Sequence, residues 1–226
     1  MRLYPDRMSL LTTLITRLDR FNQRHPWSHN DLYAPWVVRK VAASGAREVL
    51  DVGCGTGNLL ALLRRRADSV IGLEPDPGTA AIASARFADT PGVTVNRAGF
   101  EGRDPERRWD AITLVAVLHH LPLEPTLREL RASLNPGGRL VVVGCHRDEG
   151  PADQLTGLVS LLLNPLIGLL KHPAPAAEPP PHMRAPTAEP PETLARIRAA
   201  AARELPGARV RRRLFWRHTL VYDHPA

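Results

Sequence analysis

The chain has 226 residues with 43% hydrophobic content, which suits one globular domain with additions and is long enough to bury a core. Two cysteines exclude a disulfide framework, and the N-terminus has Asp6 and Arg7 but no apolar segment of the kind found in signal peptides, so we expect a cytoplasmic protein. The net charge of +7 raises nucleic acid as a partner, but the arginines are scattered apart from short runs at 64–66 and 211–213, which favours solvated surface.

Residues 1 to about 45 predict two helices. The first has apolar residues at helical spacing, namely Leu10, Leu11, Leu14, Ile15 and Leu18. The polar and aromatic stretch 25–31 interrupts the pattern, and a second short helix follows through Trp36, Val37 and Val41.

Strand and helix patterns then alternate along the chain. We expect strands at 48–52, 70–73, 93–96, 111–115 and 140–143, and helices around 59–63, 78–87 and 124–134. Continuous Val, Ile and Leu strands that alternate with helices indicate a parallel sheet covered by helices on both faces.

The pattern changes after residue 145. An apolar helical run at 155–170 is interrupted by Asn164-Pro165 and falls short of the roughly 18 residues that span a bilayer, so we expect no membrane span. Eight prolines follow between 173 and 191, too many for a helix or an inner strand. A helix near 192–205 and two strand-like runs at 210–216 and 219–223 end the chain.

The most informative segment runs from Val49 to Leu60. A buried strand ends after Asp51 and enters a loop with glycines at 53, 55 and 57, which opens a helix. Glycines allow positive φ and let a ligand approach the backbone, and a strand–glycine loop–helix unit binds nucleotide-like cofactors in α/β sheets. The dinucleotide fingerprint needs a glycine at position 58, where this chain has Asn58, so NAD is disfavoured.

The spacing Asp-x-Gly-x-Gly-x-Gly resembles motif I of the class I S-adenosylmethionine (SAM)-dependent methyltransferases, in their bacterial small-molecule branch. Further features follow in that family's order: Glu74, 23 residues after Asp51; the segment 97–101; the strand that starts at Trp109; and the turn Pro136-Gly-Gly. The resemblance implies a Rossmann-like fold with a mostly parallel seven-stranded sheet, helices on both faces and a C-terminal antiparallel hairpin.

The resemblance also implies the cofactor SAM, with S-adenosylhomocysteine as product, and a set of cofactor-binding residues. An acidic residue at position 74 can accept both ribose hydroxyls. Many relatives place an Asp where this chain has Gly99, so Phe100 and Glu101 are alternatives for stacking and for the adenine amino group, although Phe100 is equally a core residue. The expected residues are Asp51, Gly53, Cys54, Gly55, Gly57, Glu74, Pro75, Phe100, Glu101, Val115 and Ala116.

Histidines follow the fourth strand, where an acceptor would approach. His119 and His120 are candidate bases, with a slight preference for His120 as the pocket-facing one; capping or packing is the alternative. Helices 1–45 form a lid over a methyltransferase domain at 46–226 in this interpretation, and His29, Trp27 and Tyr33 contact the site. His146, just before a substrate-covering insertion at about 150–192, is a weaker candidate for substrate binding. The apolar helix of this insertion forms a roof over the acceptor in this interpretation, and a dimer contact or a membrane-surface helix is the alternative.

The sequence therefore predicts methyl transfer to an O, N or C atom of a small molecule, with natural-product biosynthesis as one setting. The fourth strand ends in Val115-Ala-Val-Leu118 and lacks the Asn/Asp-Pro-Pro-aromatic run that holds a flipped base. An RNA or protein methyltransferase, and a SAM-binding protein without methyl transfer, are the alternatives. We predict no metal site, and either a monomer or a homodimer.

Overall fold

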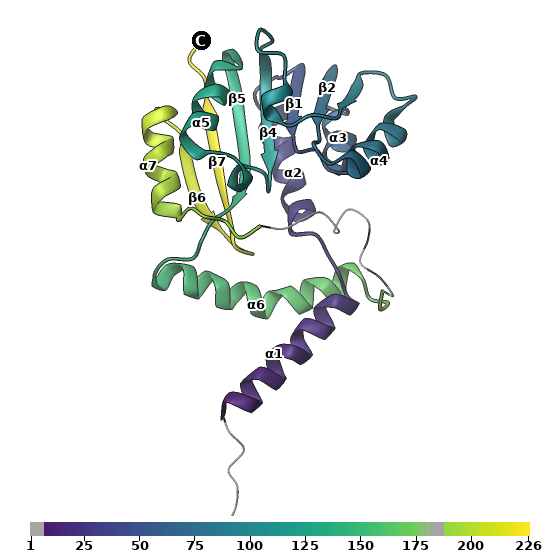
Figure 1. The fold of residues 1–226 in the computed structure, drawn as a ribbon, viewed down its shortest axis with the longest axis vertical. Coiled ribbons are helices and arrows are strands. Elements are labelled where there is room, and N and C mark those ends of the chain that lie inside the picture. Colours follow the sequence, from purple (N-terminus) through teal and green to yellow (C-terminus); the bar gives the residue numbers. More distant parts are fainter. Residues whose placement is uncertain (1–6, 177, 179, 181–187) are drawn as a thin grey trace, which may run out of the picture.

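A computed structural model describes residues 7–176, 178, 180 and 188–226 of the chain. Its centre is a seven-stranded sheet in the order β3-β2-β1-β4-β5-β7-β6 (Figure 1). The strands from β1 to β5 are parallel, and β7 is antiparallel to both β5 and β6, so the predicted C-terminal hairpin is confirmed. The strands are β1 Glu48–Val52, β2 Ser69–Leu73, β3 Val93–Asn96, β4 Trp109–Val115, β5 Leu134–Cys145, β6 Arg209–Arg213 and β7 Arg217–Asp223.

Helices cover both faces of the sheet, as the continuous apolar strands predict. On one face, α2 (His29–Ala42) and α3 (Asn58–Leu63) pack against alternate strand residues such as Val49 and Val141. On the other face, α5 (Leu123–Ala132) and α7 (Leu194–Glu204) pack against Leu50 and Leu140. The remaining elements are α4 (Pro77–Phe87) and the short 3₁₀ helices η1 (Phe100–Gly102) and η2 (Leu118–His120).

The second N-terminal helix is part of the core of the domain. Val37 and Val41 of α2 are fully buried in the same cluster as the first strand and α3. The first helix, α1 (Arg7–Arg24), leads away from the sheet (Figure 1).

The apolar run after β5 forms one long helix, α6 (Pro151–Lys171), which lies across the end of the sheet (Figure 1). The expectation that Asn164-Pro165 breaks this run is wrong, because contacts on both sides of Pro165 hold one continuous helix: the Ser160 hydroxyl accepts from the N–H of Phe215, and Gly168 packs on the His25 carbonyl. By length and composition α6 could therefore cross a bilayer, and only 17% of it is buried. Part of the proline-rich stretch that follows lies outside the described residues.

The sheet order defines where a ligand binds. β1 and β4 are neighbours in the sheet. After β1 the chain continues to β2 on one side, and after β4 it continues to β5 on the other side, so the direction of the connections reverses between β1 and β4. In open α/β sheets ligands bind outside the carboxyl ends of the strands at such a point. The glycine loop and Glu74 both follow strands at this edge.

Candidate active site at the carboxyl edge of the sheet

The glycine loop joins β1 to α3, and its three glycines have different roles. All have positive φ, of 68°, 56° and 83° at Gly53, Gly55 and Gly57. A Cβ at Gly53 would clash with Val117, and one at Gly57 would clash with Phe87. A Cβ at Gly55 would meet nothing within 4 Å, so this position borders open space where a ligand can approach the backbone.

Two buried carboxylates lie behind this loop. Asp51 accepts a hydrogen bond of 2.6 Å from the Thr113 hydroxyl. Glu74 accepts from the backbone N–H groups of Gly55 and Asp76, at 2.9 and 3.0 Å, so its two oxygens are held in fixed positions. These bonds orient the Glu74 carboxylate toward the glycine loop and leave lone pairs for further donors.

The electrostatics of this pair are unusual for a buried site. Asp51 is 2% exposed and Glu74 is 9% exposed, and within the described part of the chain neither forms an ion pair. Burial raises the pKa of Asp51 to about 7; the Thr113 hydrogen bond opposes this shift and the charge of Glu74 adds to it. Buried carboxylates are normally paired, so the site favours a positively charged ligand.

The surroundings of Gly99, which follows the end of β3, explain why this chain lacks the Asp that many relatives have at this position. A Cβ at position 99 would clash with the carboxylate of Glu101, so Glu101 occupies the space that a side chain at 99 would need. Phe100 is 5% exposed and belongs to the core, with the Arg103 guanidinium 4.1 Å from its ring centroid. The structure thus places Phe100 in the core and leaves Glu101 at the surface.

The end of β4 contains a strained residue that the sequence did not indicate. Ala116 has a φ of 57°, and its N–H donates to the carbonyl of Val143. A non-glycine residue in this region costs free energy and is more frequent at functional sites. Val115 and Ala116 are both partly exposed, and the next residue, Val117, packs against Gly53 of the glycine loop.

Two other predicted cofactor residues contribute little through their side chains. The N–H of Cys54 donates to the carbonyl of Leu73, and its thiol packs against Gly72 in the core. Burial, with the nearby charges of Asp51 and Glu74, raises the pKa of this thiol. Pro75 is exposed, and the following Asp76 caps α4 by accepting from the N–H of Thr79.

A small cavity of about 10 Å³, which is room for roughly one water molecule, lies where β4 and β5 end and β7 begins, and we call it the His119 pocket. Most of its walls are apolar, and its polar groups are His119, Cys145, Glu192 and His218. His120, the histidine preferred from the sequence, is exposed and does not line this cavity, whereas η2 turns His119 toward it. The lining residues are Leu118, His119, Leu121, Leu123, Cys145, Pro191, Glu192, Ile197 and His218.

The two histidines of the His119 pocket are held neutral. Burial lowers the pKa of His119 to about 4, helped by the charges of His120 and Arg217. Burial lowers the pKa of His218 to about 3. Neither ring nitrogen of His218, nor Nδ1 of His119, has a hydrogen-bond partner among the described residues. Buried polar atoms are nearly always paired, so these nitrogens indicate a ligand or ordered water.

The predicted lid residues do not reach this pocket. The Trp27 indole donates to the carbonyl of Asn164, and Nε2 of His29 lies 3.0 Å from the Asn164 Oδ1. The hydroxyl of Tyr33 donates to the carbonyl of Leu214. These three side chains therefore attach α6 and the β6–β7 turn to the N-terminal segment, and no residue of α6 or of the described N-terminal helices lines the pocket.

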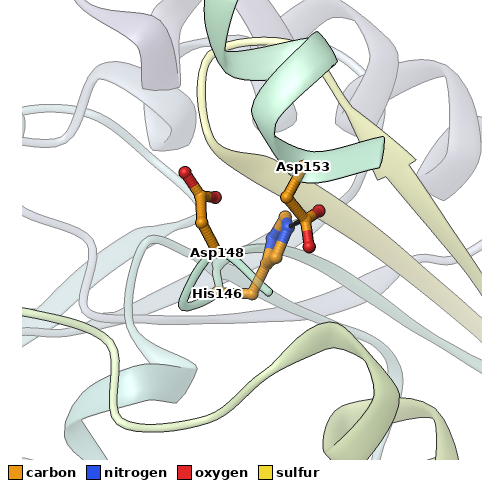
Figure 2. Close-up of side chains that lie close together, drawn as sticks. All are labelled: His146, Asp148 and Asp153. Atoms are coloured by element: carbon orange, nitrogen blue, oxygen red, sulfur yellow. Dashed lines mark hydrogen bonds and ion pairs between the residues drawn. The ribbon is translucent and has the colours of Figure 1, made fainter. Parts of the chain in front are cut away.

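His146 belongs to a charged cluster at the start of α6 (Figure 2). Its Nε2 lies 3.2 Å from Asp153 Oδ1, and one polar atom from each of His146, Asp148 and Asp153 lies within 4.8 Å of the others. Arg212 also donates to Asp153, at 2.5 Å, and the N–H of Glu149 donates to its other oxygen. A guanidinium in direct contact makes this a poor place for a metal cation, so we assign the cluster to the attachment of α6.

Sequence reasoning missed Thr113 and His218. Thr113 is the fifth of the seven residues of β4, and a single hydroxyl among apolar residues of a strand that is buried on both faces was the available signal. His218 was assigned to the connection between two strands, whereas it lies within β7 with its ring against Gly144.

Comparisons with known proteins agree with this geometry. A family described as "Methyltransferase domain" matches residues 12–168. An uncharacterised methyltransferase of Mycobacterium bovis is 31% identical over 204 residues, which cover 88% of this chain and 98% of the relative. The chain therefore belongs to the SAM-dependent methyltransferase family, and its fold is the Rossmann-like fold of the class I enzymes.

Two further proteins are similar over different lengths. The trans-aconitate 2-methyltransferase of Methylobacterium nodulans is 34% identical over 122 residues, covering 53% of this chain and 46% of that enzyme. The structure of a magnesium protoporphyrin IX methyltransferase from Synechocystis matches with a TM-score of 0.55 at 15% identity, over 99% of this chain and all of that one. The second likeness concerns the fold alone.

Proposed function

We propose that this methyltransferase transfers the methyl group of SAM to a hydroxyl group of a small, mostly apolar molecule that binds against the His119 pocket and widens it on binding. The observation that carries the proposal is the lining of that pocket, where apolar side chains surround two neutral imidazoles with free nitrogens. The substrates in the names of the two similar enzymes, an organic acid and a porphyrin, differ too much to choose the acceptor.

The residues of the carboxyl edge fit SAM. Its ammonium and sulfonium groups supply the positive charge that the unpaired carboxylates of Asp51 and Glu74 lack. In this proposal Glu74, which two backbone N–H groups hold in position, accepts the ribose hydroxyls, and Glu101 accepts the adenine amino group. When bound, SAM supplies a methyl group on a positively charged sulfur. The open side of Gly55, with Val115 and Ala116, gives room for it.

His119 is the proposed proton acceptor. It is neutral at neutral pH, and its Nδ1 is buried without a partner, so it can take the proton of an acceptor hydroxyl. A pKa of about 4 makes it a weak base, which favours an acidic hydroxyl such as a phenol or an enol. His218 supplies a second neutral imidazole that orients the acceptor oxygen.

A nucleic-acid substrate has less support. The arginines of the second basic run are engaged within the fold: Arg212 pairs with Asp153, and Arg213 donates to Thr219. The run at 64–66 is exposed at the end of α3 but is short. Charged contacts to phosphates need a larger free patch than this.

The test is to measure S-adenosylhomocysteine formation with a panel of phenols, enols, amines and RNA. His119→Ala should lower kcat by about two orders of magnitude or more without changing SAM affinity, because proton transfer to a positioned base contributes that much. The matched control is His120→Ala, whose exposed ring should leave turnover unchanged. Equal turnover in both variants would contradict the role of His119. SAM binding with no product from any acceptor would favour the binding-only alternative.

A further inference from the structure

The helix α6 has an inner stripe of small and polar residues that faces the domain. Four of them make contacts that depend on the residue type. Asp153 pairs with Arg212, Ser160 accepts from the N–H of Phe215, and the Asn164 Oδ1 lies 3.0 Å from Nε2 of His29. A Cβ at Gly168 would lie 2.6 Å from the carbonyl of His25. The stripe consists of Asp153, Gly157, Ser160, Asn164 and Gly168, which share one side of the helix by their spacing.

The opposite side of α6 is apolar and exposed to solvent, and we call it the outer face. Leu170 is 82% exposed, Leu155 is 64% exposed, and no charged residue occurs between Asp153 and Lys171. Elsewhere, Ile82 is the one large apolar side chain of the described residues with comparable exposure. The outer face consists of Leu155, Leu158, Val159, Leu161, Leu162, Leu166, Leu169 and Leu170.

This polarity is the reverse of an ordinary surface helix, which buries its apolar stripe. A contiguous exposed apolar patch of this kind marks a protein or membrane contact. Protein interfaces combine an apolar centre with aromatic and arginine anchors and with hydrogen bonds. The outer face has only aliphatic side chains and no hydrogen-bonding group, which matches the acyl region of a bilayer better than a second protein surface.

Basic residues lie near one end of the outer face. Lys171 is the last residue of α6 and His172 follows it, and both are exposed. Helix α1 contacts α6 and carries the exposed Arg17, Arg20 and Arg24 together with the exposed Asp19, so its exposed charge is basic on balance. Cations beside an apolar helix strengthen binding to anionic headgroups. Charge and apolarity thus indicate the same partner.

We propose that the outer face of α6 binds the surface of a bilayer that contains anionic lipid, with the helix axis parallel to the membrane plane. A spanning orientation would strip the inner stripe from its partners, from Arg212 near one end of α6 to His25 near the other. Because α6 lies across the end of the sheet, the bilayer faces the edge that carries the glycine loop and the His119 pocket (Figure 1). A lipophilic acceptor in the bilayer would then be close to this edge. The inference rests on α6 alone and not on the proposed acceptor.

The test is flotation of the full chain with vesicles, without SAM or acceptor. We expect binding to phosphatidylcholine vesicles that contain about one-third phosphatidylglycerol, and weaker binding to pure phosphatidylcholine. The double variant Leu162→Glu/Leu166→Glu should lower the partition coefficient by about two orders of magnitude, because two leucines no longer enter the acyl region. The matched control is Ile82→Glu, which changes an exposed apolar residue of α4 and should bind as the wild type does.

Each outcome separates the alternatives. SAM titration confirms that the variants are folded, since the substituted side chains are exposed. Absence of wild-type flotation, or equal flotation of the double variant, would overturn the proposal. A wild-type dimer that the double variant converts to a monomer, without vesicle binding, would assign the outer face to a second copy. Wild-type protein that resists alkaline carbonate extraction would indicate a spanning helix and would also overturn it.

Discussion

A substitution of Asp51 tests directly whether the proposed SAM site carries a negative charge that no ion pair compensates. Its pKa is raised from 3.8 to about 7 by burial. The folded state therefore binds more protons than the unfolded state between these two values. The stability that this group contributes is complete below its unfolded pKa and is lost as the pH rises through about 7. Above that pH the ligand-free fold carries the full cost of a buried, unpaired carboxylate.

The magnitude follows from the size of the shift. A pKa unit corresponds to ~1.4 kcal/mol, so ionising Asp51 costs the ligand-free protein on the order of 4 kcal/mol above neutral pH. Asparagine is nearly isosteric and keeps an oxygen that can accept the Thr113 hydroxyl, but it cannot ionise. Asp51→Asn should thus be more stable than the wild type at about pH 8, with a much smaller difference at about pH 5. The same substitution should weaken the binding of SAM and S-adenosylhomocysteine, since both carry the ammonium group.

The assay combines urea denaturation at the two pH values with calorimetric titration of both ligands. Asp110→Asn is the matched control, because Asp110 accepts the N–H groups of Arg47 and Glu48 and the amide of Asn135. Burial would raise the pKa of Asp110, but these hydrogen bonds lower it overall, so this variant should lose stability above pH 4. A wild type whose stability is equal at both pH values, together with Asp51→Asn that gains nothing in alkali, would refute the reasoning.

Three further substitutions test separate parts of the structure. Gly55→Ala should weaken SAM binding at least tenfold while costing ~1–2 kcal/mol of stability from its positive φ, measured by calorimetry and urea denaturation; unchanged affinity would place the donor elsewhere. Ser160→Ala should cost about 1–3 kcal/mol in urea denaturation, because it leaves a buried N–H of the β6–β7 turn unpaired, and a loss near zero would remove it as an anchor. His218 stays neutral in the fold down to about pH 3, whereas the unfolded chain gains a proton below about 6.5, so stability falls with acid in this range by ~2 kcal/mol at pH 5. His218→Gln should flatten that acid limb, and an unchanged limb would mean that the imidazole is solvated.

The arrangement of the proposed SAM site could be derived from the sequence because its signals are local. The strand that contains Asp51, the three glycines and Glu74 at the next strand end all lie within the 27 residues from 48 to 74. Their geometry depends on backbone rules for strands, glycines and strand ends. The family resemblance adds the antiparallel hairpin that ends the parallel sheet, and the strand order comes from the structure alone.

The surroundings of the proposed methyl acceptor are harder to predict, because contacts between segments far apart in the sequence define them. Trp27 and His29 contact a residue that follows them by about 135 positions, and polar aromatic side chains look alike whether they bind a ligand or another helix. The choice between His119 and His120 depends on how η2 packs. The apolar run of α6 predicts a helix whose leucines face inward over the acceptor. In the structure these leucines face solvent, and polar contacts such as that of Ser160 orient the helix.

The anchors of α6 lead to the pocket through the β6–β7 turn. Phe215 and Trp216 both have positive φ, of 59° and 56°, a costly conformation for aromatic residues. Ser160 satisfies the turn's buried N–H, and His29 stacks on the Phe215 ring at 5.1 Å. The next residues along β7 are Arg217 and the pocket residue His218. A membrane that binds the outer face of α6 would therefore act on a strained turn two residues from the pocket. This connection predicts that vesicles which bind the outer face also change acceptor turnover, and that Ser160→Ala weakens this effect more than it weakens vesicle binding.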